Sequence, residues 1–218
     1  MRSCSRPAGK FSAREICVLA LLAALIFAAK FALASVPNIN LNAPLMILAT
    51  VFFGWKALCA VWIYVLLEGL VFGFHVWWVS YVFIWPLLVV AAMLCRSSEL
   101  FRGKTAAVAW AVVAGFWGLA FGPLMYIPYF CIMGGWKGYL AMWIAGIPFD
   151  LVHCAGNFAA TLVLYLPLYR VLCLVAGDPP AQHPRPAADT VGSADESAAG
   201  DTGTTAAPGA DTGPGQDD

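Results

Sequence analysis

The sequence has few charged residues, and most of its acids lie outside its apolar part. Charged residues make up 11% of the 218 residues, whereas 61% are hydrophobic and 14% are aromatic. Eight of the twelve acids follow Gly177, so residues 14–173 carry only the remaining four. These residues contain six apolar stretches that are long enough, or nearly long enough, to cross a bilayer. The composition excludes a soluble globular domain and predicts an all-α integral membrane protein.

Several chemical motifs are also missing. No GxxxxGK[ST] loop is present, so we expect no ATP binding by such a loop. There is no CxxC pair and no metal-ligand spacing, and we expect no metal, no cofactor and no nucleic-acid partner. The seven cysteines are interpreted as small apolar residues of membrane helices. They are Cys4, Cys17, Cys59, Cys95, Cys131, Cys154 and Cys173.

The two ends of the chain differ from its apolar part. Residues 177–218 consist mostly of Ala, Gly, Pro, Asp and Thr, and cannot bury enough surface to fold. We predict that they form a disordered, acidic, cytosolic tail. Residues 1–13 are basic and are predicted to be cytosolic. Residues 32–35 (ALAS) resemble a signal-peptidase site, but the preceding apolar run is long and Lys30 interrupts it, so we expect the first helix to be retained.

The membrane domain, residues 14–176, is predicted to be a bundle of six transmembrane helices. The expected spans are 14–35, a short one ending near 53, 56–74, one ending near 95, 105–128, and 148–173. Pro148 is placed at the start of the last helix, because proline is favoured in a first turn. Residues 138–147 would then be interfacial, and Asp150 would lie where the helix dipole favours a negative charge.

Basic residues predict the orientation of this bundle. The lysines and arginines of the N-terminus, of the turn at residue 56, of the 96–104 loop and at Arg170 fall on one side. The loops of the other side offer only Lys137. The positive-inside rule therefore places both termini in the cytosol.

Polar residues concentrate in the outer half of the predicted bundle. Asp150, His153 and Asn157 follow the spacing i, i+3, i+7 and share one helix face. Glu68 and Lys30 fall in the outer halves of their own helices. Ionisable groups inside a membrane are costly and face a cavity or one another, so we predict a ligand pocket open to the outside. Its predicted substrate-binding residues are Asn38, Asn40, Glu68, His75, Tyr81, Trp85, Tyr126, Tyr129, Trp143, Asp150, His153 and Asn157.

The chemistry of these residues favours one class of ligand. Carboxylates and amides bind N–H donors or a cationic nitrogen, and stacked aromatic rings hold a flat ring or a cation. A small nitrogen-rich heterocycle fits this set. Simpler interpretations stay open, because Trp and Tyr also form interfacial belts, Asp150 can cap its helix, and Lys30 and Glu68 can neutralise each other as a structural pair.

Small residues form stripes on three of the predicted helices. Ala20, Ala24, Ala28 and Ala32 recur at every fourth residue of the first one. Such a stripe lets another helix approach closely, and we interpret this one as a contact surface for a partner protein. Two glycine pairs repeat the spacing, and for these, packing inside the bundle is an equal alternative. They are Gly69 with Gly73 and Gly118 with Gly122.

The sequence resembles the substrate-binding S component of energy-coupling factor (ECF) transporters, which are bacterial importers of vitamins and related micronutrients. The resemblance covers residues 14–173 and rests on the six predicted spans, the stretch ALLAALIFAAKFALA, the VPNIN loop and LLEGLVFGF. It implies a vitamin-like substrate, a location in the bacterial plasma membrane and no catalysis by this chain. It also implies that Ala20, Ala24 and Ala28 contact a transmembrane coupling subunit driven by two ATP-binding subunits.

Two other classes of function remain open. Asp150 and His153, one helical turn apart, could act as a general acid–base pair of an intramembrane enzyme, with Glu68 assisting. Alternatively, Glu68 and Asp150 could be the proton sites of a self-sufficient carrier. An S component binds its ligand without turnover and co-purifies with its partners. An enzyme turns over alone, and a carrier accumulates substrate without ATP.

Overall fold

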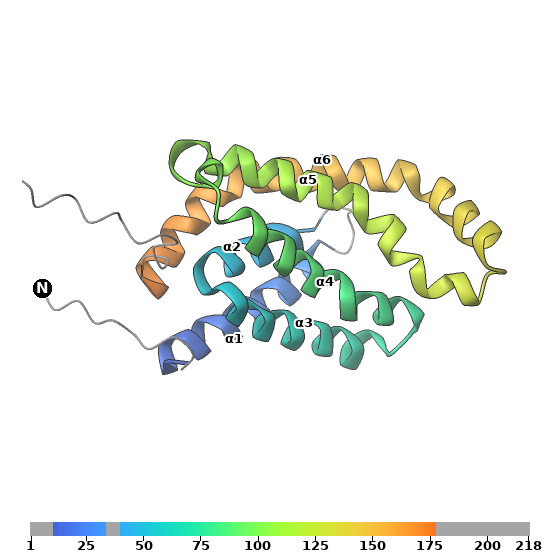
Figure 1. Cartoon of the computed structure of the whole chain (residues 1–218). Coiled ribbons are helices and arrows are strands. Elements are labelled where there is room, and N and C mark those ends of the chain that lie inside the picture. Colours follow the sequence, from blue (N-terminus) through green and yellow to red (C-terminus); the bar gives the residue numbers. More distant parts are fainter. Residues whose placement is uncertain (1–10, 34–39, 178–218) are drawn as a thin grey trace, which may run out of the picture. The chain divides into compact units, whose positions relative to one another are not determined.

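The structure is helical throughout the part of the chain that it describes. The computed structural model describes residues 11–33 and 40–177, and these residues contain no strand. The predicted tail after residue 177, most of the N-terminal segment, and Asn38 lie outside them. The long helices in Figure 1 are α1 (Ala13–Ala32), α2 (Asn42–Phe53), α3 (Ala57–Phe72), α4 (Val76–Cys95), α5 (Ala106–Met125) and α6 (Trp136–Ala176). Short 3-10 turns connect them: η1 (Gly54–Lys56), η2 (Glu99–Phe101), η3 (Gly103–Thr105) and η4 (Ile127–Cys131).

Helix α1 begins at a capping box. The Ser12 hydroxyl accepts from the backbone N–H of Glu15, and the Glu15 carboxylate accepts from the backbone N–H of Ser12. These bonds satisfy N–H groups that have no partner inside the helix. One face of α1 packs into the bundle, whereas the alanine stripe lies on an exposed face. The buried residues are Val18, Leu19, Leu22, Ala23 and Ile26.

Helix α2 is short and central. Of its 12 residues, 11 are buried, and its length of about 18 Å is well below the ~30 Å of a hydrocarbon core. Gly54, at φ 57°, reverses the chain into α3, a conformation that glycine adopts without strain. Asn42 at the start of α2 donates to the Tyr64 hydroxyl of α3 (2.8 Å). The two helices thus form a hairpin, and α2 is enclosed by protein.

Five helical segments of the described chain are long and apolar enough to cross a membrane. They are Ala13–Ala32, Asn42–Phe72, Val76–Cys95, Ala106–Cys131 and Trp136–Ala176. The second includes both α2 and α3, so six separate spans remain a prediction. The helix ends predicted near residues 53 and 95 are confirmed.

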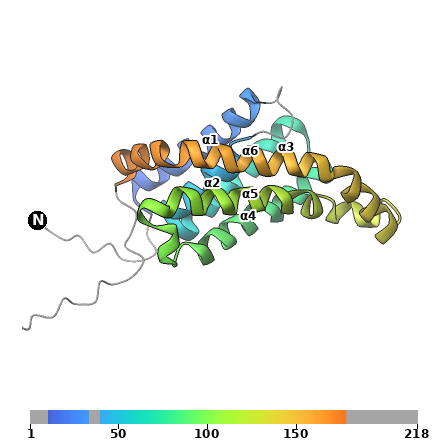
Figure 2. The ribbon, with the colours of Figure 1, turned by 90° about the horizontal axis from the view of Figure 1, so that it is seen from above.

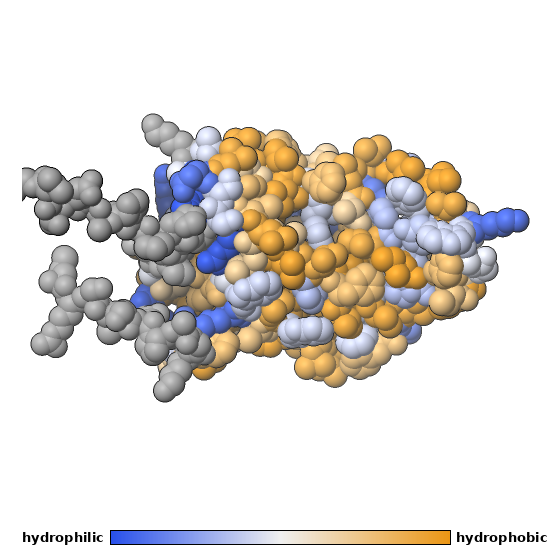
Figure 3. Space-filling view, in the orientation of Figure 1, coloured by the Kyte–Doolittle hydropathy of each residue, from blue (hydrophilic) through white to orange (hydrophobic). Residues whose placement is uncertain are grey.

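The first and last helices meet at one end of the bundle. Arg14 donates to the backbone carbonyls of Leu174 and Val175, which brings the start of α1 beside the end of α6. Lys56 and Glu15 form an ion pair there (3.0 Å), and we call this the basic end. Figure 3 shows apolar residues across the middle of the visible face, with hydrophilic residues gathered toward its two ends. This distribution suits helices that cross a bilayer.

The last helix is longer than predicted. α6 runs without interruption from Trp136 to Ala176, so the prediction of a helix start at Pro148, after an interfacial segment at 138–147, is wrong. Proline inside a helix removes one backbone hydrogen bond, and a helix packed on its neighbours can bend there instead of ending. Figure 1 shows the first turns of α6 at an angle to the rest. Asp150 lies about four turns into α6, so the helix dipole does not stabilise its charge.

Helices α5 and α6 lie side by side in both ribbon views (Figures 1 and 2). A Cβ built on Gly118 would be 2.6 Å from the backbone nitrogen of Cys154, and one on Gly122 would collide with the carboxylate of Asp150. The contact at Gly118 is with backbone, which cannot rotate away, so the observed approach requires glycine there, whereas the contact at Gly122 is with a side chain, which can rotate. This glycine pair therefore serves packing within the bundle.

Candidate functional site

The centre of the candidate site is an ion pair between α1 and α3. Lys30, in the last turn of α1, bonds through Nζ to Oε2 of Glu68. The side chain of Glu68 is fully buried (0% exposed), whereas that of Lys30 is 27% exposed. An isolated buried carboxylate is costly, so the pair compensates the charge of Glu68. The other oxygen of Glu68, Oε1, is buried and has no hydrogen-bond partner among the described residues.

Three aromatic rings surround the ammonium of Lys30. Its Nζ lies 5.5 Å from the ring centroids of Phe72 and Trp77, and 4.9 Å from that of Tyr81. The Tyr81 hydroxyl is 3.4 Å from the same atom. Aromatic faces attract cations at such distances. The ammonium is thus held by three rings and a carboxylate together.

A chain of ring contacts leads from this pair to α6. The centroids of Tyr81 and Trp85 are 5.5 Å apart, those of Trp85 and Phe121 5.6 Å, and those of Phe121 and His153 4.8 Å. Tyr81 and Trp85 are four residues apart and share a face of α4. The indole nitrogen of Trp85 is buried without a partner in the described part of the chain. The rings therefore form a wall that includes an unused N–H donor.

Two asparagines close the site at the start of α2. The Nδ2 atom of Asn40 is 3.2 Å from Nε2 of His153. The Oδ1 atom of Asn40 accepts a hydrogen bond from the backbone N–H of Asn42 at 3.2 Å. An amide nitrogen only donates, so the contact with His153 requires an unprotonated Nε2. Asn42 donates to Tyr64 through its own amide, while its Oδ1 is buried and unpartnered within the described residues.

We call these residues the polar–aromatic cluster. It contains five of the predicted site residues, namely Asn40, Glu68, Tyr81, Trp85 and His153, which come from four parts of the chain. Its members are Lys30, Asn40, Asn42, Tyr64, Glu68, Phe72, Trp77, Tyr81, Trp85, Phe121 and His153.

A buried polar stripe on α6 extends from the cluster. Asp150, His153 and Asn157 are all buried, as their spacing on one face indicates, and Thr161 continues the stripe. Both polar atoms of the Asn157 amide and the Thr161 hydroxyl are buried without a partner in residues 11–33 and 40–177. Buried polar groups are nearly always hydrogen-bonded, so these unpaired atoms mark the stripe as part of the candidate site.

The remaining predicted residues lie elsewhere. The ring centroids of Tyr126 and Tyr129 are 6.3 Å apart, and those of Tyr139 and Trp143 are 6.5 Å apart. These rings belong to the region of η4 and the first turns of α6. His75 is exposed at the N-cap of α4. Tyr126 lies near Asp150 of the polar stripe, whereas the ring contacts of Tyr129 and Trp143 are with other aromatic residues of this region.

Sequence reasoning missed some members of the cluster. Tyr64 and Phe72 lie four residues before and after Glu68, so the helical period could have found them. Phe121 carries no such signal, because α5 offers several aromatic residues with no polar neighbour in sequence.

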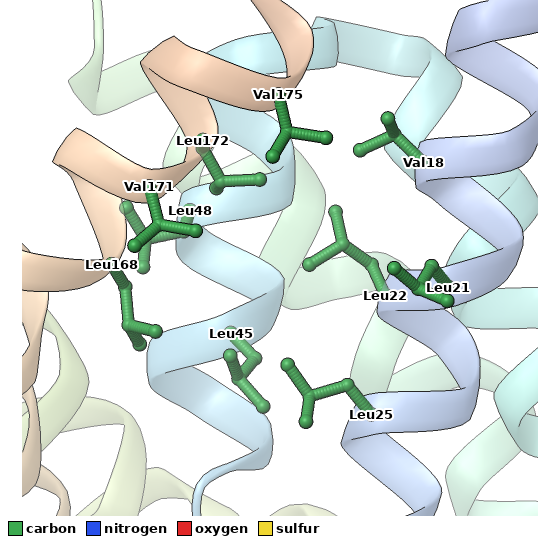
Figure 4. Close-up of a pocket in the computed structure, with 10 residues that line it drawn as sticks. All are labelled: Val18, Leu21, Leu22, Leu25, Leu45, Leu48, Leu168, Val171, Leu172 and Val175. Atoms are coloured by element: carbon green, nitrogen blue, oxygen red, sulfur yellow. The ribbon is translucent and has the colours of Figure 1, made fainter.

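A separate hollow lies near the basic end. It has a volume of about 110 Å³ and lies between α1, α2 and α6 (Figure 4). Because only aliphatic side chains line it, it offers nothing to orient a polar solute. The lining residues are Val18, Leu21, Leu22, Leu25, Leu45, Leu48, Leu168, Val171, Leu172 and Val175.

No family model, no curated protein and no solved structure matches this chain. Fold and site define the class of the protein: an all-helical bundle compatible with a membrane location, with a buried polar–aromatic cluster at the end opposite the basic one.

Proposed function

We propose that this chain is the substrate-capturing membrane subunit of an ATP-driven micronutrient importer, similar to the S component of ECF transporters. The chain would bind a small nitrogen-rich molecule from outside and pass it to a coupling subunit with two ATPases. The observation that carries the proposal is the set of buried polar atoms without partners, in and beside the polar–aromatic cluster. These atoms are Asn42 Oδ1, Glu68 Oε1, Trp85 Nε1 and both amide atoms of Asn157.

A bound solute would give these atoms the partners they lack. A buried donor or acceptor left unpaired costs about 1–3 kcal/mol, and lipid supplies no hydrogen bonds. The atoms include carboxylate and amide acceptors as well as amide and indole donors, so they match a molecule that carries both. The flat rings of Tyr81, Trp85 and Phe121 suit a planar heterocycle.

The exposed face of α1 supports the proposal that a partner subunit binds to this chain. Ala20, Ala24 and Ala28 are all exposed, whereas the buried residues of α1 face the bundle. An exposed stripe of methyl groups allows the backbone of another helix to come close, which is how helices associate in lipid. This surface is the proposed contact with the coupling subunit.

The charges support the orientation. Arg14, Lys56, Arg96 and Arg102 precede or follow the membrane helices on the side of the basic end, and the positive-inside rule assigns that side to the cytosol. Both termini are then cytosolic, and the polar–aromatic cluster faces the outside of a bacterial plasma membrane, from which a nutrient arrives.

Affinity purification from native membranes tests this function. We expect the tagged chain to retain a membrane partner and two subunits that carry ATP-binding loops. We also expect uptake of the substrate by this assembly to need ATP. Accumulation of substrate by the chain alone in vesicles without ATP would instead establish a proton-coupled carrier. Conversion of the molecule would establish an enzyme that uses Asp150 and His153.

A further inference from the structure

The surroundings of Lys30 resemble a binding site for an organic cation. Its ammonium lies between 4.9 and 5.5 Å from three ring centroids and is bonded to a carboxylate. Aromatic rings placed around a cation in this way are a recurrent means of recognising ammonium ligands. A purely structural ion pair needs only the acid and the base. The rings of Phe72, Trp77 and Tyr81 add a cage.

Lys30 fills this cage incompletely. Oε1 of the fully buried Glu68 remains unpartnered among the described residues, and the Tyr81 hydroxyl is at a long 3.4 Å. The lysine side chain is also 27% exposed, at the last turn of α1. A long flexible side chain near the end of a membrane helix can move its ammonium outward to water. The cage can therefore be emptied without moving a helix.

We propose that Lys30 is a tethered substitute for the substrate, and that the substrate is a flat organic cation. The positive nitrogen of the substrate takes the position of the Lys30 ammonium beside Glu68, and Lys30 turns outward. This inference rests on the proposed function of the same site and narrows its substrate class. The carboxylate of Glu68 has a cationic partner in both states, so no buried negative charge is left uncompensated during exchange.

The exchange gives the site selectivity. A neutral heterocycle cannot replace an ammonium beside a buried carboxylate, because the carboxylate would lose its counter-charge. A cation can, and it competes with a tethered group whose effective concentration is on the order of millimolar. The apparent dissociation constant of the cation equals its intrinsic value divided by the fraction of molecules in which Lys30 has left the cage. Removal of the Lys30 ammonium must then increase the affinity for cations.

The first experiment compares two matched probes on the purified full chain. The probes are 1-methylnicotinamide, a planar aromatic cation, and nicotinamide, its neutral analogue, with binding followed by titration calorimetry. We expect Lys30→Met to bind the cation at least tenfold more tightly than the wild type does, and Glu68→Gln to bind it at least tenfold more weakly. Binding of nicotinamide should not change. The control is Lys137→Met, which removes an exposed lysine and should match the wild type.

The opposite results would overturn the inference. If Lys30→Met binds the cation no better than the wild type does, Lys30 is not a competitor. If the cation binds to none of the proteins, the site does not take cations. If Lys30→Met binds both probes more tightly by the same factor, the site is not selective for cations.

A second experiment uses the wild-type chain and so does not depend on the folding of a variant. Amines are acetylated briefly with N-hydroxysuccinimidyl acetate, and labelling of each lysine is read by peptide mass spectrometry. We expect 1-methylnicotinamide to increase labelling of Lys30 at least threefold, because the displaced amine is exposed, and nicotinamide to have no effect. Lys56, paired with Glu15 at the basic end, is the internal control. Unchanged labelling of Lys30 at saturating cation would contradict the displacement.

The two proposals can fail separately. Both probe experiments use the chain without partners, so they do not depend on coupling to ATP hydrolysis. A chain that co-purifies with ATPase subunits but shows no effect of the cation keeps the transport function and loses this inference. A chain that exchanges Lys30 for the cation but has no ATPase partner keeps the inference and loses the transport function.

Discussion

The carboxylate of Asp150 lies directly against Gly122, at the position that a Cβ on α5 would occupy. A Cβ on Gly118, one turn earlier, would be 2.6 Å from the backbone nitrogen of Cys154. The glycine pair of α5 therefore fixes how near α6 comes, and with it the position of the polar stripe on α6.

The first prediction concerns this close approach. At Gly118, a methyl group would meet backbone atoms of His153 and Cys154 at 2.6–2.7 Å, and backbone cannot rotate away. We expect Gly118→Ala to destabilise the bundle by about 1–3 kcal/mol, seen as a lower midpoint of thermal unfolding in detergent. Gly122→Ala meets only a side chain, which can rotate, and should cost less. Equal midpoints for Gly118→Ala and the wild type would show that α5 and α6 are not so close.

The second prediction concerns Asn157. Its amide is fully buried and has no partner in the described residues, so it does not stabilise the empty bundle. We expect Asn157→Leu to leave the unfolding midpoint unchanged or raised, because an unpaired polar group is removed. Retention of the native ligand should fall about tenfold, which corresponds to ~1.4 kcal/mol. The matched control is Thr50→Val, a buried polar residue whose hydroxyl bonds within α2. Loss of folded protein in Asn157→Leu would indicate a structural role instead.

The third prediction concerns the exposed alanine stripe. Ala24→Trp places a large side chain on a face of α1 that does not pack into the bundle. We expect normal folding and ligand binding, but at least a tenfold loss of co-purifying ATPase subunits, because the partner helix can no longer approach. Val163→Trp, on an exposed position of α6 (68%), is the control and should retain them. If both variants retain the subunits equally, the stripe is not the contact.

The fourth prediction concerns the connection between α2 and α4. Arg96 follows α4 and donates through Nη1 to the Thr50 carbonyl at 2.8 Å. We expect Arg96→Met to cost about 1.5–3 kcal/mol of stability, as for hydrogen bonds to charged groups, and Arg96→Lys to recover part of it. Arg102→Met removes an arginine of an exposed pair and should change stability by less than about 0.5 kcal/mol. Similar losses in the two Met variants would contradict a specific role for Arg96.

The sequence was sufficient to predict that the helices form, but not to predict every residue at which they begin and end. Apolar runs and turn residues predicted the ends of α2 and α4 at residues 53 and 95. The helix start predicted at Pro148 was wrong, because the local preference of proline for a first turn was outweighed by the packing of α6 along α5. Helix ends that depend on tertiary contacts are not encoded within a few residues.

The candidate site was predictable only along single helices. The spacing of Asp150, His153 and Asn157 was enough to place them on one buried face. The rotation of each helix about its axis was not predictable, because in a membrane protein the outward face is as apolar as the inward one. Leu66 and Leu70 of α3, for example, are exposed beside the buried Glu68. For this reason Phe121 was missed, and the rings of Tyr126, Tyr129 and Trp143 were predicted in the site although their ring contacts lie in the region of η4 and the first turns of α6.

Native mass spectrometry of the full chain, purified from its native membrane in detergent, tests the central claim most directly. The claim is that the polar–aromatic cluster holds a small nitrogen-rich molecule. We predict a bound species of vitamin-like mass on the wild type and on Glu99→Gln, whose acid is exposed (81%), and its loss from Glu68→Gln. A wild-type chain that carries no small molecule, or a molecule that Glu68→Gln retains as well as Glu99→Gln does, would contradict the claim.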